Sequence, residues 1–208
     1  MSSALASLEP QAPRGLARAA RPARPARPAL ARRVYRHVRA MLAAIGLMCL
    51  IWFPFFNLSK VVSPSMQPTL RGSGRVGGDW AVSERISYLF RSPRRWEVVR
   101  FTDDDGYEVS KRVIGLPGES VQLINGKLLI DGREVPVPRE LSFLHYYAYG
   151  PHLHNGRAAP CGDGYFVLGD DSKDSQDSRY TGPISREQIT SRTWLRVWPA
   201  RRIGWVGW

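Results

Sequence analysis

Two serines stand close together in the segment 63–70, which reads SPSMQPTL. The segment begins seven residues after a hydrophobic run that ends at Phe56. A serine hydroxyl is a poor nucleophile until a neighbouring base removes its proton. Because a serine beside a proline is most often only a turn residue, Ser65 becomes a candidate nucleophile only if the remaining chain supplies a base.

Lys111 is the best candidate for that base. Residues 107–114 alternate as in a β-strand, which puts Lys111 on the same face as Tyr107, Val109 and Val113. Lysine is rarely buried on an apolar face, and burial there disfavours the ammonium form and lowers its pKa. A neutral lysine amine can accept a serine proton, as in the Ser/Lys variants of the catalytic triad. A lysine whose ammonium reaches solvent at the strand edge is the alternative.

The other polar residues that bear chemistry are histidines and a loop rich in serine and aspartate. His145, His152 and His154 leave a Ser-His-Asp triad open, although no carboxylate is placed to orient them. The loop, residues 169–183, reads GDDSKDSQDSRYTGP. Its aspartates do not follow the spacing of a calcium-binding loop. The pattern instead favours a hydrogen-bonded loop that delivers a hydroxyl to an active site.

Three segments resemble the sequence boxes of type I signal peptidases, which are membrane-bound Ser/Lys endopeptidases that remove signal peptides. Residues 63–70 match the box S-x-S-M-x-P-T-L, and residues 111–119 (KRVIGLPGE) match the lysine box. Residues 169–183 match the box G-D-(N/D)-x-x-x-S-x-D-S-R-x-x-G-P. A single box of this kind can arise by chance. Three boxes in this order, after a hydrophobic run, are very unlikely to do so.

The resemblance implies a role for each site residue. Ser65 is implied as the nucleophile, and Lys111 as the general base that later protonates the leaving amine. The Ser63 hydroxyl and the Ser65 backbone N–H are implied as donors to the oxyanion of the tetrahedral intermediate. Ser175 is implied to hydrogen-bond the Lys111 amine and fix its direction. The supporting loop residues are Asp170, Asp177 and Arg179.

The resemblance also implies the substrates, which are exported preproteins carrying signal peptides. The family cuts after small residues at the first and third positions before the scissile bond, often Ala-x-Ala. We assign the walls of the shallow substrate pocket to Val61, Met66 and Val109. Ser110 departs from the family pattern, in which an apolar residue commonly precedes the lysine, and we expect it to alter the pocket lining. No cofactor and no metal ion are expected.

The candidate nucleophile is predicted to follow a membrane anchor at residues 40–58. Residues 40–56 carry no charge and as a helix span about 26 Å, close to the ~30 Å hydrocarbon core. Residues 1–39 hold nine arginines and one acid and are predicted to be a disordered basic tail that lies on anionic lipid. The positive-inside rule leaves the N-terminus in the cytoplasm and the remaining chain outside. We expect the bacterial inner (plasma) membrane, with an organellar membrane left open by the Arg-rich start.

Residues 59–208 are predicted to form an all-β catalytic domain, as an antiparallel barrel or sandwich behind the single transmembrane helix. Short alternating segments separated by turns are typical of this class. Asn125-Gly126 lies between two such segments and predicts a two-residue hairpin. Residues 139–163 are aromatic-rich with little periodicity, which predicts an insertion loop.

Two other functions remain open. The first is a pilin- or conjugation-type maturation peptidase that uses the same chemistry on a dedicated substrate. The second is a membrane-tethered module that binds polyanions through its basic tail. The net charge is +12, but the tail carries most of it, so we expect no specific nucleic-acid partner for the folded part.

Overall fold

The structure is a computed structural model that describes residues 29–74, 77–154 and 156–206. Residues 1–28 of the predicted basic tail lie outside the described residues. Residues 29–39 differ from that prediction, because they belong to a helix, α1, which runs from Ala29 to Phe55. Ala, Leu and Arg dominate this stretch and are good helix formers, so the helix continues through the basic residues.

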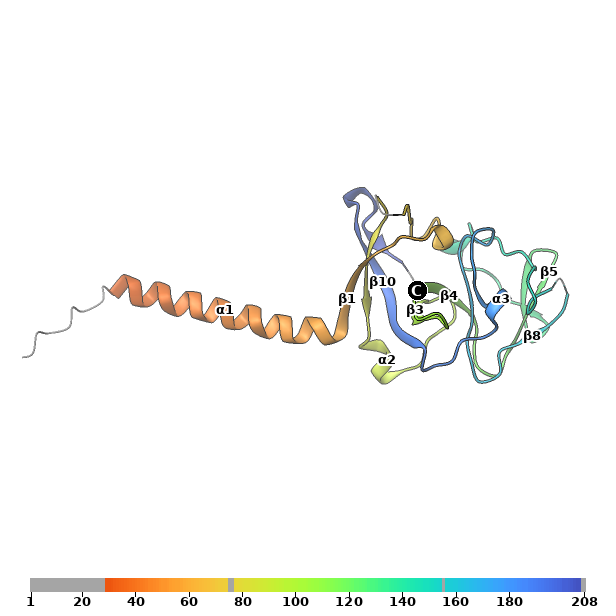
Figure 1. Cartoon of the computed structure of the whole chain (residues 1–208), viewed down its shortest axis with the longest axis horizontal. Helices are drawn as coiled ribbons and strands as arrows, with labels where there is room; N and C mark the ends of the chain where they lie inside the picture. The colour runs from red at the N-terminus through yellow and green to blue at the C-terminus, as the bar shows by residue number, and fades with distance from the viewer. Residues whose placement is uncertain (1–28, 75–76, 155, 207–208) are drawn as a thin grey trace, which may run out of the picture. The chain divides into compact units, whose positions relative to one another are not determined.

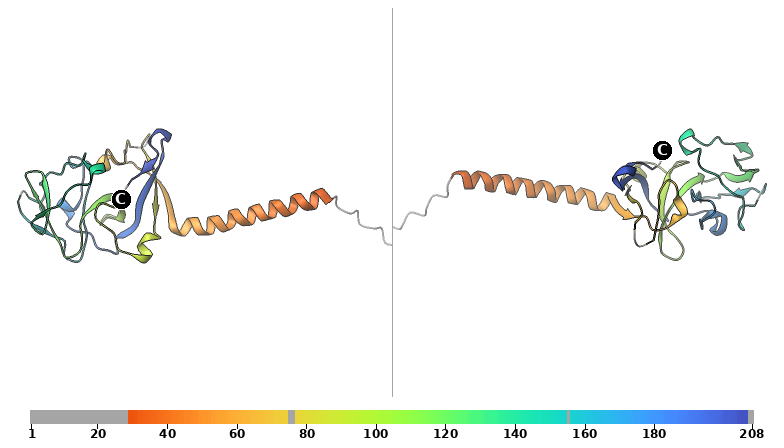
Figure 2. Two further views of the ribbon diagram at one scale, coloured as in Figure 1. Left: turned by 180° about the vertical axis from the view of Figure 1, so that it is seen from behind. Right: turned by 90° about the horizontal axis from the view of Figure 1, so that it is seen from above.

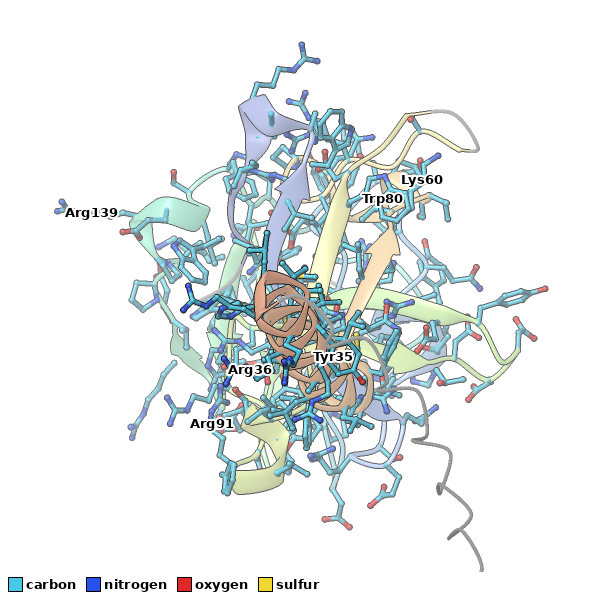
Figure 3. The ribbon with its side chains drawn as sticks, turned by 90° about the vertical axis from the view of Figure 1, so that its left-hand side faces the viewer. Tyr35, Arg36, Lys60, Trp80, Arg91 and Arg139 are labelled. Carbon is cyan, nitrogen blue, oxygen red and sulfur yellow. The ribbon has the colours of Figure 1, made fainter. Side chains whose placement is uncertain are left out.

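Helix α1 is long and apolar enough to cross a membrane over Leu30–Phe55. It contains Pro54 and ends at Phe55, whereas the sequence predicted an anchor reaching residue 58. Residues 56–58 instead belong to strand β1 (Phe56–Lys60), which pairs with β2 (Trp80–Glu84). Lys60 and Trp80 are partners in this pair, and Figure 3 shows their side chains next to each other. Because proline has no N–H to continue a helix, the change to a strand so soon after it is locally favoured.

The described residues beyond α1 form two antiparallel sheets (Figures 1 and 2). The larger has the order β1-β2-β10-β3-β4-β9, with β11 paired to β10, and the smaller has the order β7-β6-β5-β8. The larger sheet is completed by β3 (Val98–Thr102), β4 (Glu108–Gly115), β9 (Phe166–Leu168), β10 (Ile189–Trp198) and β11 (Gly204–Trp205). The smaller consists of β5 (Ser120–Ile124), β6 (Lys127–Ile130), β7 (Arg133–Glu134) and β8 (Ala159–Pro160). The predicted all-β antiparallel class is confirmed.

Short helical turns connect the strands. Two are α-helical, α2 (Ser87–Phe90) and α3 (Ser178–Thr181). Three are 3-10 turns: η1 (Pro64–Met66), η2 (Arg139–Leu141) and η3 (Ala200–Arg202). The candidate nucleophile therefore lies on a short turn after the first strand, not within a sheet.

The predicted hairpin joins β5 to β6. Asn125 has φ 52° and Gly126 has φ 80°, and two successive positive φ angles are the signature of the type I′ turn. Ile124 pairs with Lys127 directly across it. The local sequence therefore sets the register of the smaller sheet.

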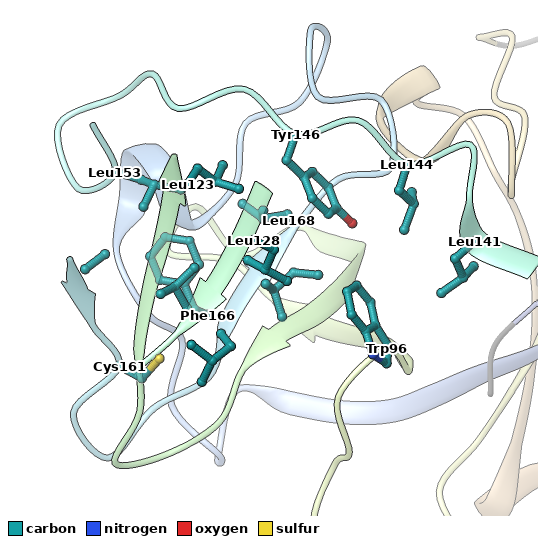
Figure 4. Packing of buried hydrophobic residues seen from close by; sticks show 14 residues of the cluster. Trp96, Leu123, Leu128, Leu141, Leu144, Tyr146, Leu153, Cys161, Phe166 and Leu168 are labelled. Atoms are coloured by element: carbon teal, nitrogen blue, oxygen red, sulfur yellow. The ribbon is translucent and has the colours of Figure 1, made fainter. Parts of the chain in front are cut away.

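The predicted insertion loop, residues 139–163, packs its apolar side chains into a core instead of projecting freely. Leu141, Leu144, Tyr146 and Leu153 are all buried. They share one cluster with residues of β5, β6 and β9 and with Trp96 (Figure 4). The apolar side chains of this loop thus pack on the strands although their spacing is not periodic. This packing explains why residues 139–163 are rich in aromatic side chains.

Candidate active site

Ser65 and Lys111 line the same cleft, which has a volume of about 850 Å³. Ser63 and the three predicted wall residues, Val61, Met66 and Val109, line it as well. The structure therefore brings together residues that are 46 positions apart in the sequence. A second cleft, of about 650 Å³, is lined by Thr69, Leu141, Arg202 and others, and contains neither Ser65 nor Lys111.

The nucleophile segment is anchored by apolar packing after Ser65 and by a capped turn before it. Met66 and Leu70 are buried in a cluster with Ala81, Val98 and Val206. Ser63 caps the turn η1, since its hydroxyl accepts a hydrogen bond from the Ser65 backbone N–H at 3.2 Å. The apolar and proline positions of SPSMQPTL thus fix a short turn whose serine faces the cleft.

The Ser/Asp-rich loop touches this turn directly. The Asp171 backbone N–H donates to the Ser65 carbonyl oxygen at 3.0 Å. A Cβ atom at Gly169 would lie 2.6 Å from that same carbonyl oxygen and would overlap the Ser175 hydroxyl. Glycine is therefore required at position 169 for the loop to approach both serines.

Lys111 lies on β4, and its amine is held by the loop. The amine donates a hydrogen bond to the Ser175 hydroxyl at 3.0 Å, and this hydroxyl donates to Asp177 Oδ2 at 2.7 Å. Among the described residues, this is the only hydrogen bond that the Lys111 amine makes. The predicted contact of Ser175 with Lys111 is therefore present. In this structure the Lys111 amine donates to Ser175 and does not donate to Ser65.

Burial controls the charge of this amine. Lys111 is 4% exposed, and this burial lowers the pKa of its amine from 10.5 to about 8. Asp177 opposes the change by favouring the ammonium form, whereas Arg179 adds to it. A pKa near 8 leaves about a tenth of the amine neutral at pH 7, a far larger share than for an exposed lysine.

Asp177 and Arg179 form the centre of the supporting loop. Arg179 Nε donates to Asp177 Oδ1 at 2.8 Å, and both side chains are fully buried. Asp177 Oδ2 also accepts from the Gly169 backbone N–H at 2.9 Å. Because the same carboxylate accepts from Ser175, the ion pair fixes the group that holds Lys111.

The insertion loop contributes to this support. The Arg179 guanidinium lies 4.8 Å from the ring centroid of Tyr149, and one of its nitrogens donates to the Ser172 hydroxyl at 2.7 Å. That hydroxyl accepts from the Tyr147 backbone N–H at 3.0 Å, and His152 N–H donates to the Arg179 carbonyl at 2.9 Å. Residues 147–152 therefore cover the loop that positions the amine.

Asp170 pairs with a residue that the sequence analysis did not assign to the site. The Arg112 guanidinium donates to both Asp170 oxygens, at 2.8 and 2.6 Å, and both side chains are fully buried. Arg112 also donates to Thr69 Oγ1 at 3.2 Å and to the Trp96 carbonyl at 2.7 Å. One side chain thus links the nucleophile segment, the lysine strand and the Ser/Asp loop. The arginine next to Lys111 in the lysine box was the available signal.

Comparison with known proteins identifies the family. A family model described as signal peptidase, peptidase S26, matches residues 34–198. The chain belongs to this family. It is therefore a serine endopeptidase that removes signal peptides, as the three boxes predicted, and it is anchored in a membrane by its N-terminal helix.

Three related proteins illustrate the range of the signal peptidase family. A probable signal peptidase I-2 of Synechocystis is 32% identical over 174 residues, covering 80% of this chain and 72% of that protein. A signal peptidase I of Leptolyngbya laminosa is 35% identical over 159 residues, covering 71% of each. A probable chloroplastic thylakoidal processing peptidase 2 of Arabidopsis thaliana is 29% identical over 153 residues, covering 69% of this chain and 38% of that protein.

The rival chemistries find less support in this signal peptidase. No histidine is among the described residues that line the cleft with Ser65. Within the described ranges, no three His, Cys, Asp or Glu side chains gather closely enough to hold a metal ion. Lys111 and several carboxylates are among the titratable groups that line the cleft with Ser65.

Proposed function

We propose that this signal peptidase cuts preproteins with a Ser65/Lys111 dyad, after sites with small residues at the first and third positions before the scissile bond. The observation that carries the proposal is a buried amine with a lowered pKa in the same cleft as an anchored serine. A base needs a pKa near the working pH, and burial is the largest cause that brings the pKa of Lys111 toward it.

The reaction begins with proton transfer. The neutral Lys111 amine donates an N–H to Ser175 and keeps its lone pair for the Ser65 hydroxyl proton. Ser65 Oγ attacks the scissile carbonyl carbon, and the resulting ammonium then protonates the leaving amine. In the second half of the reaction, the neutral Lys111 amine takes a proton from a water molecule, and the resulting hydroxide attacks the acyl carbon. The Lys111 ammonium then returns a proton to Ser65 Oγ as the ester bond breaks, which restores both residues.

Ser63 and the Ser65 backbone N–H are proposed to stabilise the oxyanion. The two groups contact each other in the structure, where the N–H donates to Ser63 Oγ. We expect the substrate carbonyl oxygen to replace this contact, so that it accepts from the N–H and from the Ser63 hydroxyl together. Donors of this kind contribute about 2.7–4 kcal/mol each to the transition state.

Val61, Met66 and Val109 are proposed as walls that admit only small side chains. Their support is that all three line the cleft, Met66 being buried and the two valines partly buried. A large side chain would displace packed residues, which costs more than its burial returns. Exported preproteins with Ala-x-Ala sites therefore fit the cleft best.

We propose that the N-terminus lies in the cytoplasm and the β domain outside it, at the bacterial plasma membrane. Arginines concentrate before the apolar run of α1, and the positive-inside rule supports this orientation. A thylakoid membrane is the alternative that the Arabidopsis thaliana relative supports.

The test uses the full-length protein in detergent and a precursor with an Ala-x-Ala site. Ser65→Ala and Lys111→Ala should each abolish cleavage, whereas Lys173→Ala, which changes an exposed lysine of the same loop, should not. An acylating inhibitor should label Ser65 in the wild type and should fail to label Ser65→Ala. Cleavage by Lys111→Ala at the wild-type rate would refute the dyad.

A further inference from the structure

The second cleft, of about 650 Å³, borders the nucleophile segment at Pro68 and Thr69 but contains neither Ser65 nor Lys111. Its other walls come from η2 and the residue Phe143 after it, and from β10, η3 and β11 with the residue that follows. The reaction described above leaves this cleft without a role. Its lining nevertheless combines charged and apolar side chains in one place.

One wall of the cleft is positively charged. Arg196 and Arg202 line it, and the Arg202 side chain is 15% exposed and lies 3.3 Å from the carboxylate of buried Asp79. Burial lowers the pKa of the Arg202 guanidinium, Asp79 opposes this effect, and Arg196, Arg71 and Arg201 lower the pKa further. Because four arginines lie close together around this carboxylate, the wall carries an excess of positive charge that an anion would stabilise.

The two guanidiniums are held in place and still have donors to offer. Arg202 Nη2 donates to the Pro68 carbonyl at 2.8 Å, and Arg196 donates from Nη1 to the Thr69 carbonyl and from Nε to the Arg202 carbonyl. Within the described ranges these contacts leave Arg202 Nη1 and Arg196 Nη2 for another acceptor. Guanidinium groups fixed in this way match the oxygens of a phosphate well.

The remaining lining of the cleft is mostly apolar. Leu141 and Val206 are buried, whereas Phe143 is 38% and Trp205 is 72% exposed. The Trp205 ring packs against Trp194, with 4.9 Å between the ring centroids. Such side chains suit an apolar chain rather than a free inorganic ion.

Glu140 is the carboxylate of the lining that opposes an anion. It is exposed on η2, where solvent screens its charge. The lining therefore holds two guanidiniums against one exposed carboxylate, and the balance favours a negatively charged ligand.

We propose that this cleft binds an amphiphilic anion, a phosphate group carried on an apolar chain. The phosphate contacts Arg196 and Arg202, and the chain packs against Phe143 and Trp205. A membrane phospholipid and a soluble phosphate ester share this chemistry. The inference does not depend on the dyad, because neither Ser65 nor Lys111 takes part in the binding.

The experiment measures binding to the full-length protein in a nonionic detergent by isothermal titration calorimetry. The probes are hexyl phosphate, inorganic phosphate and hexanol, which separate the charge from the chain. We expect hexyl phosphate to bind at least about tenfold more tightly than either of the others, and to bind less tightly as the salt concentration rises. Dihexanoyl phosphatidylglycerol then distinguishes the sources: tighter binding than hexyl phosphate assigns a membrane lipid, and weaker binding assigns a soluble phosphate ester.

Variants test the assigned contacts. Arg202→Met should weaken the binding of hexyl phosphate about tenfold, and Glu140→Gln should strengthen it about twofold to fivefold, since it removes the opposing charge. Arg139→Met is the matched control, because Arg139 neighbours Glu140 but does not line the cleft, and its side chain points away from the domain (Figure 3). It should change the affinity less than about twofold.

Ser65→Ala should bind hexyl phosphate as the wild type does, so this measurement stands whether or not the dyad is correct. Hexyl phosphate that binds no better than hexanol would overturn the site. A loss of affinity in Arg139→Met as large as that in Arg202→Met would overturn it too, since only the overall charge would then matter. If Arg202→Met fails to fold, Glu140→Gln carries the test, and an unchanged affinity in that variant would count against the site.

Discussion

Replacing the buried lysine by Lys111→Met should abolish cleavage and at the same time stabilise the fold at neutral pH. Burial lowers the pKa of the amine from 10.5 to about 8, which corresponds to about 3 kcal/mol at roughly 1.4 kcal/mol for each pH unit. Methionine fills the space of the lysine stem without a charge. Its introduction loses the hydrogen bond to Ser175, worth about 1 kcal/mol. The net gain should be about 2 kcal/mol.

The sign of the effect fixes its pH range. The unfolded chain binds the Lys111 proton more tightly than the folded chain, so burial costs stability wherever both states are protonated, below pH about 8. As the pH rises from about 8 to 10.5, the folded state loses its proton first and this cost disappears. The stability advantage of Lys111→Met should therefore be largest below pH 8. By pH 10.5 the variant should be about 1 kcal/mol less stable than the wild type, because only the loss of the hydrogen bond to Ser175 remains.

Thermal unfolding of the full-length protein in detergent, followed by tryptophan fluorescence, measures the difference. A gain of about 2 kcal/mol corresponds to a rise in Tm of about 4–8 °C for a domain of this size. Lys127→Met is the control, because the Lys127 side chain is 63% exposed in a surface ion pair and should change Tm by less than about 2 °C. If the Tm of Lys111→Met at pH 7 is equal to or below that of the wild type, burial does not lower the pKa of the Lys111 amine to about 8.

The remaining predictions concern the support of the dyad and the smaller sheet. Ser175→Ala removes the partner of the Lys111 amine and should lower kcat about 10- to 100-fold with little change in KM; an unchanged kcat would exclude a positioning role. Asp170→Ala leaves the buried Arg112 charge unpaired and should cost about 3–5 kcal/mol in unfolding free energy, which a loss of less than 1 kcal/mol in denaturant titration would contradict. Gly126→Val places a β-branched residue at φ 80° and should cost about 1–2 kcal/mol, with Lys127→Val beside it as the control.

The reacting residues could be predicted from the sequence because their chemistry is unusual for their positions. A lysine on an otherwise apolar strand face needs an explanation, and strand alternation was enough to place Lys111 with Val109 and Val113. The two valines pack in one cluster, as predicted. The hairpin at Asn125-Gly126 was equally local, since its turn type depends on two residues.

Long-range partners could not be predicted in the same way. Arg112 and Asp170 are 58 positions apart, and nothing in their local patterns distinguishes a buried ion pair from two solvated charges. The end of α1 depends on the pairing of β1 with β2, which outweighs the apolar character of Leu58. The burial of residues 139–163 likewise depends on a sheet that forms elsewhere in the chain.

The low pKa of Lys111 depends on how the surrounding charges are arranged in pairs. The amine lies near Asp177 and Asp170, each of which would favour the ammonium form and raise the pKa. Asp177 is neutralised by Arg179 and Asp170 by Arg112, in ion pairs that are themselves buried. Arg179 offsets part of the effect of Asp177, and desolvation is the largest effect on the pKa of the amine. Removing Arg179 should therefore raise the pKa of Lys111 and move the rising limb of the pH–rate profile to higher pH.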